Sequence, residues 1–341
     1  MGKTGKSSIK FDNIVYIAEK ASVVGKKEGD GPLGKYFDDV IEDPNVGMNT
    51  WEEAESELQK RVITTLLKKS GLNNRDIRYI FSGDLLGQLI ATSFGLMEFQ
   101  IPVFGLYGAC STMGESMSLG AAFVAAGYAD NVIALTSSHF ASAEKQFRYP
   151  LEYGSQRPLC ATWTVTGSGG VILSSTIKGG VKVTGVTTGK IVDYGITDSM
   201  NMGAAMAPAA CDCIYNNFMD FDLQPDYYDA IYTGDLGKIG QKILIDLMIE
   251  KGFDISEKHH DCGIEIFDDS YQDTHAGGSG CGCSATTLCA HILRQMEEGF
   301  FKRVLFVPTG ALLSTTSFNE GQSVPGIAHA VMLERIEGNG E

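Results

Sequence analysis

LNNRDIRYIFSGDL, residues 72–85, can be laid over LQPDYYDAIYTGDL, residues 223–236, without a gap. The two stretches begin with the same leucine, pair Ile80 with Ile231, and both end in Gly-Asp-Leu. Two matching apolar stretches that end in the same turn sequence indicate an internal repeat.

A second pair of segments repeats in the same order along the chain. GYADNVIALTSS at 127–138 lies over GFFKRVLFVPTG at 299–310, and each is a glycine followed by a buried-strand pattern. The offset is 151 residues for the first pair and 172 for the second, so the second half carries an insertion of 21 residues. We place this insertion around residues 252–270 and predict a duplicated chain.

Each half contains the same order of predicted elements. A strand and a long helix come first, then a strand ending at Gly-Asp, a second helix, a Cys/Gly/Ser-rich turn, a helix of small residues and a buried strand. A hairpin-like segment closes each half, and the glycines of VTGSGG (165–170) mark a close approach of two backbones. Strands that alternate with helices predict an α/β fold with parallel, doubly covered sheets. The main ranges are 14–20, 50–71 and 162–175 in the first half and 181–189, 203–218 and 326–337 in the second.

Composition and charge restrict the possible partners. The chain has 341 residues and a formal net charge of −15, which argues against nucleic acid as a partner. No apolar run reaches the roughly 18 to 20 residues that cross a bilayer. We expect MGKTGKS at the start of the sequence to be a mobile basic tail that contacts an anionic membrane surface weakly. We expect a cytoplasmic chain.

Eight cysteines are present, and without a secretory signal they are expected to stay reduced. The pairs Cys211/Cys213 and Cys281/Cys283 are spaced more closely than the usual C-x2-4-C zinc ligands. We expect them to be small buried residues, and we expect neither a metal nor a cofactor.

Cys110 lies in GACSTMGESM, residues 108–117, just ahead of the small-residue helix. A cysteine at this turn, within two repeated halves, resembles the thiolase and ketoacyl-synthase superfamily. The resemblance implies a thiolase-like fold with two pseudo-repeated mixed-sheet halves, 1–178 and 179–341, in a layered αβαβα arrangement. In that superfamily the cysteine is an acyl-carrying nucleophile.

Longer runs resemble one sporulation branch of the superfamily, the stage V sporulation AD family of endospore-forming bacteria. The resemblance implies a protein that binds dipicolinic acid, alone or as its calcium chelate, and supports its uptake into the developing spore with the SpoVA membrane proteins. It also implies a homodimer held peripherally at the forespore inner membrane. The runs include SSHFASAEKQFRYPLEYGSQRP, GITDSMNMGAAMAPAA, HDCGIEIFD and GGSGCGCSA.

The partners that a catalytic cysteine needs are replaced. Condensing enzymes use a histidine and a second histidine or asparagine from the second half for proton transfer and carbonyl polarisation. At those places this sequence has Asp235 and Cys281, and His275 is several residues out of position. We therefore expect a binding site rather than an enzyme; the alternatives are an acyltransferase or condensing enzyme that uses Cys110, and a scaffold with a vestigial pocket.

The helix start after Cys110 presents N–H groups and a positive dipole end, which favour a carboxylate without any basic side chain. The predicted ligand-binding residues are Cys110, His139, Arg148, Asp235, Cys281 and Gly310, where Gly310 matches the glycine turn of the family.

Three of the polar residues also have a plainer interpretation. His139, Arg148 and Arg157 lie in a segment that in this superfamily borders the pocket mouth and the dimer contact, and we favour a subunit contact for Arg157.

Asp84 and Asp235 occupy the same place in the two repeats. Because only one half carries Cys110, we expect both aspartates to cap the helix that follows.

Overall fold

The computed structural model describes residues 2–147 and 156–337, and within them the central feature is a twelve-stranded sheet. From its edge inward, the N-terminal half contains β5 (Val103–Gly105), β4 (Tyr79–Asp84), β6 (Asn131–Ser138), β8 (Gly167–Ser174) and β2 (Ser8–Gly25). The C-terminal half contains β11 (His259–Asp261), β10 (Ala230–Thr233), β13 (Arg303–Val307), β16 (Ala330–Arg335) and β9 (Val181–Thr187).

The two halves of the sheet have the same pattern of pairing. In each half the three outer strands are parallel and the two inner strands antiparallel. The long strand β2 pairs with β9, so that the half-sheets are continuous. The repeated Gly-Asp sequence follows or ends the second strand from each edge, β4 and β10. The prediction of two mixed-sheet halves is confirmed.

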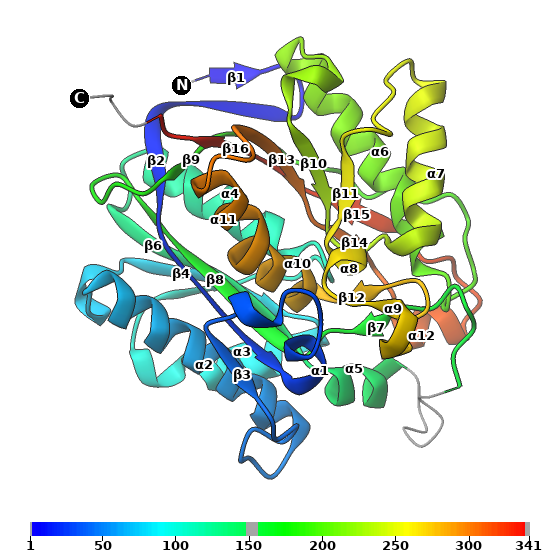
Figure 1. Cartoon of the computed structure of the whole chain (residues 1–341), viewed down its shortest axis with the longest axis horizontal. Helices are drawn as coiled ribbons and strands as arrows, with labels where there is room; N and C mark the ends of the chain where they lie inside the picture. Colours follow the sequence, from blue (N-terminus) through cyan, green and yellow to red (C-terminus); the bar gives the residue numbers. More distant parts are fainter. Residues whose placement is uncertain (1, 148–155, 338–341) are drawn as a thin grey trace.

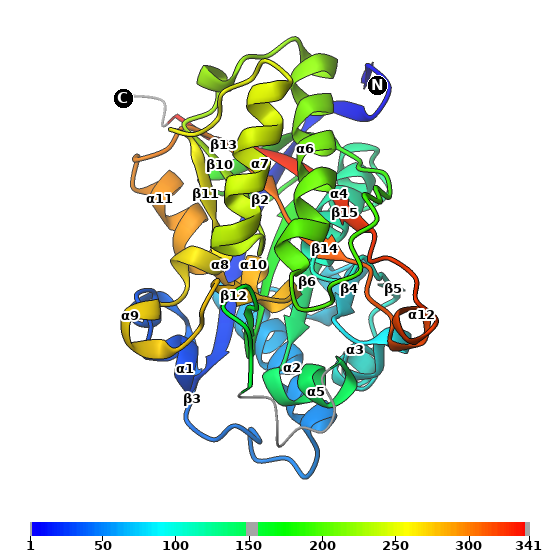
Figure 2. The same cartoon turned by 90° about the vertical axis from the view of Figure 1, so that its right-hand side faces the viewer.

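Helices complete the layers (Figures 1 and 2). The helices α2 and α3 cover one outer face, α6 and α7 cover the other, and α4, α10 and α11 lie between the half-sheets. This is the predicted αβαβα order. Their bounds are α2 Trp51–Ser70, α3 Ile90–Leu96, α4 Thr112–Ala125, α6 Met202–Phe221, α7 Gly237–Glu250, α10 Cys281–Thr287 and α11 Leu293–Glu297, the last two joined by a π-turn at Leu288–Ile292.

Smaller elements connect these layers. Two two-stranded sheets pair β7 with β12 and β14 with β15, while β1 and β3 attach to β2. Their bounds, with those of the short helices, are β1 Gly2–Thr4, α1 Lys26–Gly29, β3 Asp39–Ile41, α5 Phe140–Phe147, β7 Trp163–Thr164, α8 Cys262–Glu265, α9 Asp269–Gln272, β12 Gly278–Ser279, β14 Thr309–Ala311, α12 Thr315–Asn319 and β15 Gly326–Ala328.

Local sequence explains why α2 begins and ends where it does. The Thr50 side chain accepts from the Glu53 N–H while the Glu53 carboxylate accepts from the Thr50 N–H, a reciprocal cap. Gly71, at φ 71°, ends the helix in the left-handed conformation. Between these ends Leu58, Val62 and others of its apolar stripe are buried against the sheet.

The inner layer is possible because β8 and α10 touch backbone to backbone. A Cβ at Gly169 would lie 2.4 Å from the carbonyl of Ala285. The close approach that the VTGSGG glycines predict is therefore present, and it brings the start of α10 under the sheet.

Two expectations about local structure are wrong. The closing segments are not hairpins, because β7 pairs with β12 and β15 with β14, leaving β8 and β16 to enter the large sheet. The N-terminal residues are not a mobile tail, because β1 pairs with β2 and the Asp220 carboxylate accepts from the N–H groups of Lys6 and Ser7 at 3.0 and 2.9 Å. Among the described helices, none combines the length and apolar character needed to cross a bilayer.

Candidate functional site

Cys110 occupies a tight turn directly before α4. The Ser111 hydroxyl donates to the Gly108 carbonyl at 2.7 Å, and the Thr112 hydroxyl donates to the Ala109 carbonyl at 2.6 Å. These bonds hold Ala109 at φ 50°, an unusual backbone conformation for a residue with a Cβ. The turn sets the Cys110 side chain into the interior, where it is 3% exposed.

Asp235 comes from the other half and is anchored on two further segments. Its Oδ1 accepts from the Thr309 hydroxyl at 2.9 Å. Its Oδ2 accepts from the Ser279 hydroxyl at 3.0 Å and the Gly280 N–H at 2.9 Å. Asp235 also hydrogen bonds with the Cys110 thiol. The carboxyl therefore joins the ends of β10, β12 and β14 around Cys110.

The expectation that Asp235 caps the next helix is wrong. At the start of α7, the N–H groups of Leu236 and Gly237 donate to the Asp261 carboxylate at 2.9 and 3.1 Å. Its counterpart Asp84 does bind its own following segment, accepting from the N–H groups of Leu86 and Thr92 at 3.0 and 2.8 Å. The repeated aspartates thus have different roles in the two halves.

The electrostatics of the site oppose ionisation of the thiol. Burial raises the pKa of Cys110 well above its usual value, and the charges of Asp235 and Cys281 raise it further. Burial also raises the pKa of Asp235, although its four hydrogen-bond donors, the Cys110 thiol among them, oppose that shift. A thiolate is the reactive form of cysteine, so this thiol is poorly suited to nucleophilic attack near neutral pH.

The cavity beside Cys110 is small, about 30 Å³. That is far below the roughly 300 to 1,000 Å³ of typical small-molecule pockets. No lysine, arginine or histidine is among the described residues that line it. The lining is mainly apolar: Leu85, Tyr107, Ala109, Cys110, Ala143, Phe147, Thr164, Met202, Ser279, Ala311 and Leu313.

The start of α4 offers fewer free donors than the sequence suggested. The Ser111 N–H donates to the Gly108 carbonyl at 3.1 Å, and the Thr112 N–H donates to the Ala109 carbonyl at 3.3 Å. The turn itself therefore occupies two of the N–H groups that were expected to bind a carboxylate.

The other predicted residues are distributed unevenly around this cavity. Cys281 packs with Cys110 in one small cluster, although its thiol donates to the Ser137 carbonyl at 2.9 Å. Arg148 lies outside the described residues. His139 does not line the Cys110 cavity, because its Nε2 meets the Pro44 carbonyl at 2.9 Å and its Nδ1 accepts from the Ala141 N–H at 3.1 Å.

Gly310 touches the cysteine turn rather than the cavity. A Cβ added there would lie 2.3 Å from the Gly108 carbonyl oxygen and 3.0 Å from the Ser111 nitrogen. Only glycine allows β14 to approach the turn this closely.

Replacing Gly310 with alanine is accordingly expected to reduce the free energy of unfolding by about 2 to 3 kcal/mol, because backbone must move to admit the methyl group. Denaturant titration of the full chain measures this change. The control is Gly87→Ala, where nothing lies within 4 Å of the added carbon. Equal unfolding midpoints for the two variants would contradict the packing role.

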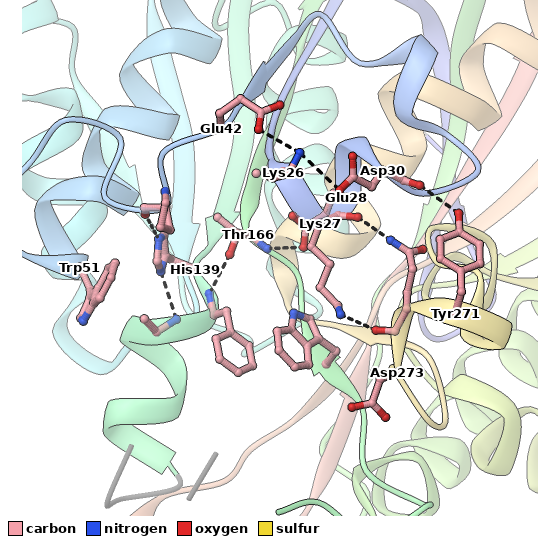
Figure 3. Close-up of a pocket in the computed structure, with 16 residues that line it drawn as sticks. Lys26, Lys27, Glu28, Asp30, Glu42, Trp51, His139, Thr166, Tyr271 and Asp273 are labelled. Atoms are coloured by element: carbon pink, nitrogen blue, oxygen red, sulfur yellow. Dashed lines mark hydrogen bonds and ion pairs between the residues drawn. The ribbon is translucent and has the colours of Figure 1, made fainter. Parts of the chain in front are cut away.

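A second and much larger cavity, about 720 Å³, contains His139 (Figure 3). Its wall combines the α1 segment, the start of α5, β7 and α9. In the part of the chain that the structure describes, no three His, Cys, Asp or Glu side chains gather as metal ligands would.

Comparison with known proteins assigns the family. Residues 5–334 match the sequence model of stage V sporulation protein AD. The chain belongs to this family. Stage V sporulation protein AD of Bacillus subtilis (strain 168) is 43% identical over 338 residues, covering 99% of both chains. The family resemblance inferred from the sequence is thus confirmed, and the chain is a sporulation protein.

The structure of this chain is similar to solved structures of enzymes. OleA from Xanthomonas campestris, bound with cerulenin, has a TM-score of 0.59 at 12% identity and covers 95% of this chain and 97% of its own. Acat5 thiolase from Ascaris suum, in complex with coenzyme A, has a TM-score of 0.55 at 12% identity and covers 95% of this chain and all of its own. At this identity the likeness shows a thiolase-like fold and nothing more.

Sequence reasoning missed several residues of the site in this family member. Thr309 and Ser279 fix Asp235, while Tyr107, Met202 and Leu313 line the cavity. Thr309 was one residue from Gly310 in the matched turn, so the repeat alignment carried a usable signal for it. The three cavity side chains come from separate loops, and no local pattern brings them together.

Proposed function

We propose that this sporulation protein is a non-catalytic member of the thiolase-like fold that binds dipicolinic acid and supports its uptake into the developing spore. The observation that carries the proposal is the anchoring of Asp235 beside Cys110. A buried carboxyl that accepts from Thr309, Ser279 and Gly280 is held in place and cannot polarise a thioester carbonyl by donating a hydrogen bond while ionised.

The same geometry disfavours the alternative of acyl transfer. A nucleophilic cysteine needs a lowered pKa or an adjacent base. Cys110 has a raised pKa, and no histidine is among the described residues that line its cavity. Retention of the turn and of the cavity, without the base, supports a site that binds rather than reacts.

Dipicolinic acid would bind with its aromatic ring between the apolar walls of this cavity. Because the cavity volume is only about 30 Å³, side chains that line it, such as Phe147, Met202 and Leu313, would have to move on binding. The dianion would also face Asp235 with no basic side chain from the described lining. A calcium chelate removes that repulsion, which favours the calcium form as the ligand.

Calorimetric titration of the full chain with dipicolinate, with calcium and with a chelator, tests this function. We expect saturable binding that calcium strengthens. Cys110→Ala should bind within a few-fold of the original chain because the thiol is not a reactant. Leu313→Trp places a larger side chain in the lining of the Cys110 cavity and should weaken dipicolinate binding by about tenfold, about 1.4 kcal/mol.

Other outcomes of this titration would decide between the alternatives. A thioester adduct on Cys110 after incubation with acetyl-coenzyme A, detected by mass spectrometry and absent in Cys110→Ala, would establish the acyltransferase. If dipicolinate binds neither with calcium nor with the chelator, the remaining alternative is a scaffold protein whose pocket is vestigial.

The proposed assembly is a homodimer. The edge strand β5 is exposed along its length and pairs with β4 on one side. Met97, which lines the same groove as Val103 of β5, is 63% exposed. An exposed apolar edge strand is a template for pairing with another chain, and a second copy offers the same strand in return.

The proposed location is the forespore inner membrane, reached through contact with SpoVA membrane proteins. Peripheral attachment is in keeping with the lack of a membrane-spanning helix among the described elements. The net charge of −15 makes direct adhesion to anionic lipid unfavourable over most of the surface, so a protein partner is the better anchor.

A further inference from the structure

The 720 Å³ cavity is lined by segments from both halves of the molecule. One wall is the segment after β2, which contains α1, and the opposite wall is α9, in the region of the insertion in the second half. Figure 3 shows Lys27 extending between these two walls. Among the described elements, no helix matching α1 lies between β9 and α6, and none matching α9 lies between β5 and α4, so the repeat did not supply these two walls.

Lys27 is held in place within the cavity. Its ammonium group donates to the Gln272 carbonyl on α9, and the Gln272 amide donates back to the Lys27 carbonyl at 2.6 Å. The ammonium also lies over the Trp163 ring, 4.2 Å from its centroid. Phe140 stacks on Trp163 with ring centroids 3.9 Å apart, and the Arg157 guanidinium lies 4.8 Å from the Trp163 centroid. Position and direction of this charge are therefore set before any ligand arrives.

Lys27 has no ion pair among the described residues, whereas its charged neighbours do. Lys26 lies 2.9 Å from Glu42 and 3.6 Å from Asp30. Asp273 lies 3.5 Å from the guanidinium of Arg157. Burial lowers the pKa of Lys27 and the charge of Arg157 adds to this shift, while the carboxylates of Glu28 and Asp273 oppose it.

The remaining wall suits a planar apolar body. Trp51, Phe140, Trp163 and Tyr271 all line the cavity, and the His139 ring is fixed there by contacts with the Pro44 carbonyl and the Ala141 N–H. Burial lowers the pKa of His139 as well. A cavity of this volume with aromatic walls and a fixed ammonium group has the form of a small-molecule site.

Charged side chains around Lys26 distinguish ligands with one carboxylate from ligands with two. Lys26 is outnumbered by Glu42 and Asp30, so the rim that surrounds it carries a net negative charge. A second carboxylate on a ligand would approach that rim, while a single carboxylate on Lys27 would be neutralised. The balance favours a monoanion.

We propose that this cavity is a second binding site, separate from the Cys110 cavity, that takes a small monocarboxylate with an aromatic or apolar body and holds its carboxylate on Lys27. The site goes beyond the proposed binding of dipicolinate, which is a dicarboxylate assigned to another part of the molecule. It gives the protein the means to respond to a second metabolite.

Calorimetric titration of the full chain with benzoate tests the proposal, with benzene-1,3-dicarboxylate as the dianionic comparison. We expect saturable benzoate binding and weaker binding of the dicarboxylate. Lys27→Met, which keeps most of the side-chain stem, should weaken benzoate by about tenfold or more. Lys27→Arg should retain binding, and Lys35→Met, on the exposed turn nearby, should leave it unchanged.

Several results would overturn the proposal: no saturable benzoate binding by the original chain, the same affinity in Lys27→Met, or tighter binding of the dicarboxylate. Thermal unfolding of each variant shows that loss of binding is not loss of folding. Dipicolinate titration of Lys27→Met separates the two sites, because unchanged dipicolinate binding supports distinct cavities. Joint loss of dipicolinate and benzoate binding would instead make the Lys27 cavity the dicarboxylate site and overturn the selectivity argued here.

Discussion

Replacing Asp235 with alanine is expected to lower the free energy of unfolding by about 4 kcal/mol. The side chain is fully buried, and its removal leaves the Thr309 hydroxyl, the Ser279 hydroxyl and the Gly280 N–H without their acceptor. Each buried donor left unsatisfied costs about 1 to 3 kcal/mol. Denaturant titration of the full chain measures the loss.

Asp235→Asn separates the charge of this residue from its shape. The remaining amide oxygen can accept from Gly280 and Ser279, and the Thr309 hydroxyl can turn to accept from the new amide. We therefore expect a loss of about 1 kcal/mol. Since the Asp235 charge helps to raise the pKa of Cys110, Asp235→Asn should also make Cys110 react faster with iodoacetamide.

The pseudo-repeat supplies a matched control at Asp84. Asp84 is equally buried and accepts from the N–H groups of Leu86 and Thr92 and from the Thr92 hydroxyl at 2.6 Å. Asp84→Asn should affect stability to a similar degree while changing Cys110 alkylation less. Cys160, a partly exposed cysteine, reports on the reagent itself. If Cys110 reacts no faster in Asp235→Asn than in Asp84→Asn, then Asp235 does not control the thiol.

The contrast between Asp84 and Asp235 shows which features of the fold and the site could be predicted from the sequence. The repeat predicted the place of each aspartate at the end of its strand, and with it the order of strands and helices, because periodic apolar patterns are local. The partner of each aspartate is not local. The last residue of β11, Asp261, lies at the start of α7, and this frees Asp235 to bind Thr309, 74 residues away.

The two cavities also show that sites formed by segments distant in the sequence are not predictable from local patterns. Cys110 was identifiable because its turn and the following helix are adjacent in the chain. The Lys27 cavity joins α1, α5, β7 and α9, which span residues 25 to 273. His139 lines the Lys27 cavity and not the Cys110 cavity for the same reason: the sequence places it beside a strand end, while its contact with Pro44 is with a residue 95 positions away.

Ionisation of Glu28 is expected to lower the free energy of unfolding as the pH rises from about 4.5 to about 7. Its side chain is buried at the floor of the Lys27 cavity, where its Oε1 accepts from the Thr166 N–H at 3.0 Å. Burial raises its pKa from 4.5 to about 7. The unfolded chain therefore releases this proton above about pH 4.5, whereas the folded chain keeps it until about pH 7.

The sign of the pH dependence follows from this difference. Between these two values the folded state binds more protons than the unfolded state, so stability falls as pH rises. A shift of about 2.5 pKa units corresponds to about 3 kcal/mol, lost progressively between about pH 4.5 and just above pH 7. Asp261, whose pKa burial also raises to about 7, acts in the same direction. His259 and His329, with pKa values lowered to about 3 and 4, act in the opposite direction below about pH 6.5.

Glu28→Gln isolates the contribution of this one group from the others. The amide oxygen can still accept from Thr166, but the side chain no longer ionises. Relative to the original chain, the variant should gain about 3 kcal/mol in free energy of unfolding between pH 5 and pH 8.5, measured by denaturant titration at each pH. Glu42→Gln is the control, because it removes a carboxylate from the rim of the same cavity, where the side chain is 73% exposed to water. A stability difference for Glu28→Gln that is as flat across pH as that for Glu42→Gln would show that Glu28 is already ionised in the folded chain.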